Sequence, residues 1–254
     1  MIGPVKAYKG VTWHYTSEFG DRFSVGETYT CKHAKVRTAG FHACLNPWHV
    51  LDYYTPYESR FLMVDIDGDI DSCDHMLTGT RMTVVKELSD REFIESLVAQ
   101  RDYRIESFDA VLSEEPHDCI WGERHGLVVQ STGSNAFIRV HSDTFYALST
   151  GDKASILVDR MCMNSLILSL GDDALIESGG SSRIVVHGTG TEVRLTGSNH
   201  VLCLAAGTVL LYGDRMLVAG EDFSADAYYV SEADGRLVPM DEDSMPVKDE
   251  VIIN

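Results

Sequence analysis

The second half of the chain carries a repeat of nine residues, and this period limits the folds that it can adopt. Apolar residues recur with gaps of nine, and once of ten, and the residue two places further on is mostly apolar as well. An apolar pair spaced by two residues is the pattern of a short strand with one buried face. The repeating positions are Ile138, Ala147, Ile156, Leu166, Leu175, Ile184, Val193, Leu202 and Leu211.

Glycines with small polar neighbours separate these pairs and indicate a turn after each strand, because such residues tolerate positive φ or cap a turn. The glycines are Gly133, Gly151, Gly171, Gly179, Gly188, Gly197 and Gly207. Two strand-turn units make about eighteen residues, the size of one coil of a parallel β-solenoid, or β-helix. Antiparallel hairpins in a sandwich or barrel also give regularly spaced short strands and remain the alternative. We favour the solenoid because the spacing persists along the whole segment.

The sequence predicts a chain of three segments. They are an α+β domain over residues 1–115, the β-solenoid over 116–220, and a cap with an acidic C-terminal tail over 221–254. Ile120 keeps the phase of the repeat, so the first coil is expected near Cys119. The phase is lost after Gly213, where the last strand edge needs a cover, and we expect Phe223–Val230 to provide it.

The first segment shows mixed elements of unequal length. Asn46, a good N-cap that is followed by proline, predicts a short helix over 46–54. A capping box of Ser89 and Glu92 predicts a second helix over 89–100. Strands are expected where β-branched and apolar residues cluster, at Val5–Tyr8, Arg60–Ile66 and Met82–Lys86.

Composition restricts the classes of partner. The 39 Asp and Glu residues outnumber the 21 Lys and Arg residues, and the formal charge of −18 disfavours direct binding to nucleic-acid phosphates and favours basic protein surfaces. The six scattered cysteines are typical of reduced thiols, so we expect no disulfide. Without a long apolar run or a secretory signal pattern, we expect a cytoplasmic protein with no membrane association.

The stretch Gly40–Pro47, followed by Tyr53 and Tyr54, resembles a domain of unknown function that is common in bacteriophage and prophage proteins. The shared core is Gly-Phe-His, a Cys two residues after the His, and a Pro-led helix that ends in a Tyr pair. The resemblance covers about residues 5–100. It implies a phage-encoded protein in the host cell, and Gly-rich repeats behind the domain, but no activity.

The same half is also similar, more weakly, to ADP-ribosyltransferase folds. The likeness lies in the segment 8–10, Tyr-Lys-Gly, and in the Gly-Phe-His strand that leads into a helix ending in Tyr. It implies NAD as cofactor, with Glu87 as the acid that stabilises the ribosyl cation and His42 as a second catalytic residue. The residues that it implies near the cofactor are Lys9, Gly10, Tyr54 and Trp13.

The pairs Cys31/His33 and His42/Cys44 together offer four side chains of the two types, Cys and His, that zinc accepts. Ligands one residue apart on a strand rarely close a tetrahedron, so we expect no metal here. The simpler interpretation is a buried Cys44 and a His42 that forms a hydrogen bond near the start of the helix.

The acidic run 65–71 resembles a calcium loop, but a strand pair that turns at Asp67-Gly68 explains the same residues. Aromatic residues are dense around the Gly-Phe-His segment and suit a cleft that stacks a ring. We expect Tyr53 in the core and Trp13 and Tyr54 at the rim of that cleft.

These observations favour a binding protein that needs no cofactor. We expect a phage- or prophage-encoded acidic factor that engages a host macromolecule with a basic surface, for example by inhibiting a nucleic-acid-binding or defence component. The solenoid is then a docking or oligomerisation surface, and its faces favour a homodimer. The alternative is an ADP-ribosyltransferase that uses NAD to modify a host protein or nucleic acid. It requires a pocket bordered by Lys9, His42, Tyr54 and Glu87, and burial of Glu87 against an arginine argues against it.

Overall fold

The computed structural model describes residues 3–55, 57–100, 109–123, 126–141, 143 and 145–241. The described residues form two compact units, an N-terminal one over 3–100 and a C-terminal one over 109–241. Most of the predicted acidic tail, residues 242–254, lies outside the described residues. Within the described ranges, every helix is too short or too polar to cross a membrane.

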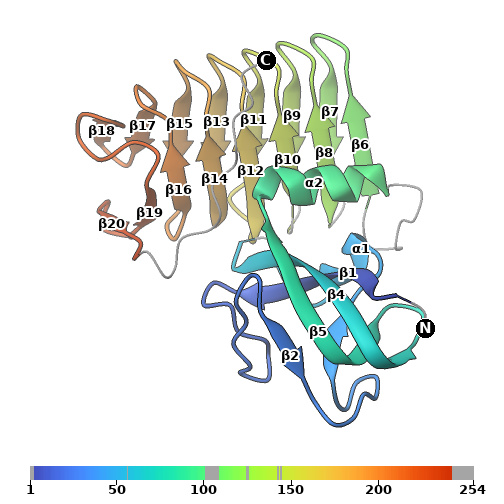
Figure 1. The fold of residues 1–254 in the computed structure, drawn as a ribbon. Coiled ribbons are helices and arrows are strands. Elements are labelled where there is room, and N and C mark those ends of the chain that lie inside the picture. Colours follow the sequence, from blue (N-terminus) through green and yellow to red (C-terminus); the bar gives the residue numbers. More distant parts are fainter. Residues whose placement is uncertain are drawn as a thin grey trace. The chain divides into compact units, whose positions relative to one another are not determined.

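The N-terminal unit is an antiparallel sheet with two helices, which confirms the α+β prediction (Figure 1). Its strand order is β1-β4-β5-β2, and β3 also pairs with β5. The elements are β1 (Val5–Thr12), β2 (Thr28–Thr30), β3 (Phe41–Ala43), α1 (Pro47–Val50), β4 (Ser59–Ser72), β5 (Leu77–Leu88) and α2 (Asp90–Ala99).

Both predicted helices form, and their N-terminal signals act as expected. Ser89 and Glu92 make the reciprocal hydrogen bonds of a capping box at the start of α2. The Asn46 side chain accepts a hydrogen bond from the Trp48 backbone N–H over 3.0 Å at the start of α1. α1 is shorter than predicted because the chain turns after Val50, whose carbonyl accepts from both following tyrosine N–H groups, those of residues 53 and 54.

The predicted turn at Asp67-Gly68 is wrong. β4 runs through both residues, and its register against β5 shifts between Asp67 and Ile70. Gly68 has a φ of 81°, so it absorbs an irregularity inside a long strand instead of ending it. The chain reverses later, where the Cys73 N–H donates to the Met76 carbonyl over 2.9 Å.

The C-terminal unit is a parallel β-solenoid of about six turns with about eighteen residues per coil, as the nine-residue period predicts. Each coil contributes one strand to each of two sheets (Figure 1). The first sheet contains β6 (Asp109–Ser113), β8 (Leu127–Ser131), β10 (Tyr146–Ser149), β12 (Ser165–Ser169), β14 (Ser182–Val186) and β16 (Val201–Leu204). The second contains β7 (Cys119–Gly122), β9 (Phe137–Val140), β11 (Ser155–Val158), β13 (Leu175–Ser178), β15 (Glu192–Leu195) and β17 (Val209–Tyr212).

Three of the predicted inward positions are wrong by one residue. Ile167, Ile176 and Leu210 lie in the solenoid core, not their neighbours Leu166, Leu175 and Leu211. The slip begins where Ala147 pairs with Ile167, a step of twenty residues in place of eighteen. Leu166 lies in β12, which is buried along its whole length, so the inward phase of this strand is hidden in an apolar run. Burial alternates in β13 and β17, which hold Leu175 and Leu211, and there the fixed count of nine misplaces the inward residue by one.

The turn glycines serve a different purpose from the predicted one. Of the seven, Gly207 alone has a positive φ. Gly151 instead stacks directly on the preceding coil, because a Cβ there would lie 2.1 Å from the carbonyl oxygen of Gly133. Gly171 and Gly188 repeat the contact with the coil before each of them, at 2.2 and 1.9 Å. The residues with a positive φ lie two positions after the stacked glycines, and not all of them are glycine. Lys153, two residues after Gly151, has a φ of 59°.

The solenoid starts earlier than residue 116 and ends with reversed strands. β6 already pairs in parallel with β8. At the other end, β18 (Arg215–Val218) pairs antiparallel with β17, and β19 (Tyr228–Ser231) pairs antiparallel with β16. A last strand, β20 (Leu237–Pro239), covers β19. The exposed edges of the last coil are therefore covered by antiparallel strands, β18 on one sheet and β19 on the other. The segment Phe223–Val230, which we expected as the cover, contains most of β19.

Replacement of Gly151 by alanine tests the stacking of the coils. The added methyl group meets rigid backbone, so we expect Gly151→Ala to lower the free energy of unfolding by about 3 kcal/mol. Gly207→Ala is the control, since nothing lies within 4 Å of its Cβ position and only the left-handed φ is strained; we expect a loss of about 1 kcal/mol there. Urea unfolding measures both, and equal losses would contradict the stacking argument.

Candidate functional site

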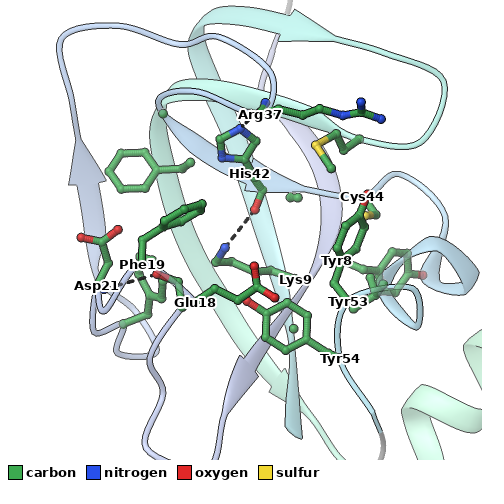
Figure 2. A pocket seen from close by; sticks show the side chains of 18 residues that line it. Tyr8, Lys9, Glu18, Phe19, Asp21, Arg37, His42, Cys44, Tyr53 and Tyr54 are labelled. Atoms are coloured by element: carbon green, nitrogen blue, oxygen red, sulfur yellow. Dashed lines mark hydrogen bonds between the residues drawn. The ribbon is translucent and has the colours of Figure 1, made fainter. Parts of the chain in front are cut away.

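A pocket of about 230 Å³ opens in the N-terminal unit (Figure 2). Its lining comes from β1 and the loop that follows it, from β3 and its flanking residues, from the end of α1 and the residues just after it, and from Met76. The aromatic side chains in its lining are Tyr8, Phe19, Phe23, Phe41, Tyr53 and Tyr54, and the charged or titratable ones are Lys9, Glu18, Asp21, Arg37, His42 and Cys44. Aromatic side chains together with polar groups that point into one cavity are typical of a small-ligand site.

The wall of the pocket depends on how α1 is anchored. Trp48 is fully buried, and its indole N–H donates to the carbonyls of Leu97 and Gln100 at 3.0 and 3.2 Å. These bonds fasten α1 to the end of α2 and fix the turn that carries Tyr54. The Tyr54 ring then packs on β1 at Gly10, where a Cβ would lie 2.3 Å from the ring. Glycine is therefore required at position 10 because the Tyr54 ring lies too close for a side chain, and not because of its backbone φ.

Lys9 provides the amine at the floor of the pocket. Only 8% of the residue is exposed, and its Nζ donates to the His42 carbonyl over 3.0 Å. The same Nζ lies 5.1 Å from the centre of the Phe23 ring. Burial lowers the pKa of Lys9 to about 8, against the opposing charges of Cys44, Asp21 and Glu18. Figure 2 shows the amine directed at the His42 carbonyl, with Glu18 and Tyr54 beside it.

His42 lines the same pocket, but its ring is already engaged. Its Nε2 accepts a hydrogen bond from the Arg37 backbone N–H over 3.0 Å. The predicted bond near the start of the helix is thus wrong, because the ring holds the 35–39 turn instead. Burial, with a smaller contribution from the charge of Lys9, lowers the pKa of His42. The imidazole acts here as a neutral structural acceptor.

Exposed aromatic side chains form part of the rim. Phe19 is 81% exposed and Tyr53 is 42% exposed, although both line the pocket. The prediction that Tyr53 belongs to the core is therefore wrong. Glu18 and Asp21 flank Phe19 and are also exposed. Sequence reasoning missed this rim, since the available signal was only an aromatic residue between two acids in a polar loop.

Glu87 does not line the pocket; it lies in a buried ion pair. Arg60 Nη1 lies 3.2 Å from Glu87 Oε1, and the two side chains are 2% and 5% exposed. Tyr15 donates its hydroxyl proton to Glu87 Oε2 over 2.5 Å and accepts from Arg60 over 2.6 Å. Burial and the bond to Glu87 raise the pKa of Tyr15 to about 12. Both carboxylate oxygens of Glu87 are therefore engaged, one by Arg60 and one by Tyr15.

The structure thus brings together four of the six predicted site residues. Lys9, Gly10, His42 and Tyr54 line one pocket, and Tyr54, expected at the rim of a cleft, forms part of its wall. Trp13 lies instead with the buried pair, 5.7 Å from ring centre to the Arg60 guanidinium carbon. The arrangement does not favour Glu87 as a catalytic acid.

The four candidate zinc ligands, for which we expected no metal, do not assemble. Cys31 is exposed and its thiol donates to the His33 carbonyl at 3.3 Å, whereas Cys44 is buried. Burial raises the pKa of the Cys44 thiol to about 12. Across the part of the chain that the structure describes, no group of three His, Cys, Asp or Glu side chains is placed to hold a metal ion.

The comparison with protein families matches the pocket-bearing unit. Residues 5–96 fit the family described as a domain of unknown function, DUF7666, and this span contains every residue that lines the pocket. The N-terminal segment is accordingly such a domain, followed by a β-solenoid. No curated protein and no solved structure matches the chain. The family description names no activity and no link to bacteriophages or ADP-ribosyltransferases.

The burial of Lys9 predicts how stability depends on pH. The unfolded chain keeps the proton up to the ordinary pKa of 10.5, whereas the folded protein releases it near pH 8. Between these values the unfolded state binds more protons, so the free energy of unfolding rises with pH across this window. We expect the difference in unfolding free energy between wild type and Lys9→Met, measured in urea, to grow in favour of wild type from pH 8 to 10.5. A constant difference would contradict the assigned burial.

The buried pair predicts a structural role for Glu87. Glu87→Gln leaves the Arg60 charge buried without its partner, and we expect unfolding free energy to fall by about 3 kcal/mol. Glu95→Gln is the matched control, because Glu95 pairs with Arg91 at the surface and such pairs contribute about 0.5 kcal/mol. Thermal and urea unfolding compare the two. Equal, small losses in both variants would show that the Arg60 pair is not structural.

Proposed function

We propose that this is a binding protein, in which the pocket of the N-terminal domain holds a small ring-bearing molecule and the solenoid is a rigid scaffold for a macromolecular partner. The observation that carries the proposal is the pocket itself, with the Lys9 amine at its floor and the Tyr54 ring in its wall. Aromatic walls favour a flat ring, and the amine supplies the polar contact that orients it.

The size of the pocket supports a small occupant. At about 230 Å³ it is below the usual range of drug-sized sites, so it suits one ring with a short polar substituent. Two of the three Lys9 hydrogens remain for such a substituent after the bond to the His42 carbonyl. An oxygen acceptor on the ring is the complement of this amine.

Binding is favoured over ADP-ribosyl transfer. The alternative needs Glu87 next to the reacting sugar, but Arg60 and Tyr15 take both carboxylate oxygens outside the pocket. His42, the second residue of that alternative, has its Nε2 occupied by the Arg37 backbone. A fold-level likeness without an available acid does not support an activity.

For the macromolecular partner, we propose a host protein with a basic surface, and an origin of this chain in a bacteriophage or prophage. The formal charge of −18 supports a basic partner. Phe19, exposed between Glu18 and Asp21 at the pocket rim, offers an apolar anchor with acidic flanks. A ligand in the pocket would then lie beside the surface that the partner covers.

Ring binding is tested with a variant that moves the Tyr54 wall. We expect one-ring phenols and aldehydes to give saturation-transfer NMR signals with the full chain, and Gly10→Ala to weaken their binding at least tenfold, about 1.4 kcal/mol. Gly3→Ala is the matched control, since nothing lies within 4 Å of its Cβ position. Unchanged affinity in Gly10→Ala would overturn the pocket as the binding site, and the absence of any signal with wild type would overturn the proposal.

A further inference from the structure

The Lys9 amine is placed as a reactive group rather than as a surface charge. It sits on β1 with 8% of the residue exposed, faces the pocket, and its one hydrogen bond within the described residues goes to the His42 carbonyl. The carboxylates of Glu18 and Asp21 act on it electrostatically from the rim. Lys6, three places earlier on the same strand, is exposed and provides an internal comparison.

We propose that Lys9 captures a small aromatic aldehyde in this pocket as a reversible imine. The proposal rests on the proposed function and names the ligand class of that site. A carbonyl group on a ring places its oxygen and carbon at the amine while the ring contacts the aromatic wall. An anionic ligand fits less well, because Glu18 and Asp21 repel it at the rim.

The chemistry balances without any further reactant. The lone pair of the neutral amine attacks the carbonyl carbon and the C=O π bond opens to a carbinolamine. One proton moves from nitrogen to oxygen, and the Tyr54 hydroxyl donates a second one as the C–O bond breaks and water leaves. The remaining N–H proton then returns to the Tyr54 oxygen, which leaves the neutral C=N bond. Nothing is oxidised or reduced, and hydrolysis by one water reverses the step.

Two features of the site favour this sequence. With a pKa of about 8, roughly a fifth of Lys9 is neutral at pH 7.4, against about a thousandth of an ordinary lysine. Tyr54 supplies the proton that the departing hydroxyl needs, since burial, followed by the charge of Glu18, raises the pKa of its phenol and keeps it protonated. The apolar walls also limit the water that returns an imine to aldehyde.

The test is reductive trapping of the full chain with benzaldehyde and cyanoborohydride at pH 7.4, followed by peptide mass spectrometry. We expect the benzyl adduct to form on Lys9 at least about tenfold faster than on Lys6, and to saturate with benzaldehyde concentration. Both lysines report within one molecule, so the comparison does not depend on the folding of a variant. Lys6→Arg should leave the rate at Lys9 unchanged.

Other outcomes separate the two proposals. In one outcome, benzaldehyde gives a saturation-transfer signal that Gly10→Ala abolishes, but no preferential adduct on Lys9. This result would overturn imine capture and leave ring binding in place. Adducts that follow surface exposure, with more on Lys6 than on Lys9, would also overturn capture. Neither a signal nor an adduct would overturn both. An adduct on Lys9 that is lost when Gly10→Ala moves the wall would support both.

Discussion

Stacking of backbone on backbone is the constraint on which the solenoid depends. Each coil must return to the same height so that its strands pair in parallel with the coil before it, and at the turn this brings Gly151 against the Gly133 carbonyl. Only a residue without Cβ fits there. The nine-residue spacing in the sequence results from this requirement. Ala147 pairs with Ile167, twenty residues later, so the extra residues lie in the turns and not in the strands.

Elements with local signals were predictable from the sequence, and contacts between distant residues were not. Caps at Asn46 and Ser89 involve neighbours within three residues, so they fixed both helix starts. The inward phase around Ile167 was not readable, since its neighbours on both sides are equally apolar and buried. Glu87 has a suitable type and position for an acid, but its pairing with Arg60 is set by the register of two strands.

The candidate site shows the same division. The Gly-Phe-His segment and the Tyr pair pointed to the part of the chain that forms the pocket, which is built from that segment and the strand beside it. Nothing in the sequence placed the loop with Phe19 over it, or showed that Lys9 is buried while Lys6 is not. The burial of Lys9 depends on which segments pack against its face of β1. The residue pattern of a single strand does not specify those segments.

The reversed strands at the end of the solenoid set a rule for how this protein can change in length. An antiparallel neighbour such as β18 or β19 cannot guide another parallel coil, so growth at that end is terminated in the fold itself. Longer or shorter relatives must therefore gain or lose complete coils upstream of β16, each with its own glycine at the stacked corner. An insertion shorter than a coil would move core side chains to the outer face if it lay within a strand. Such insertions are therefore expected only in the turns.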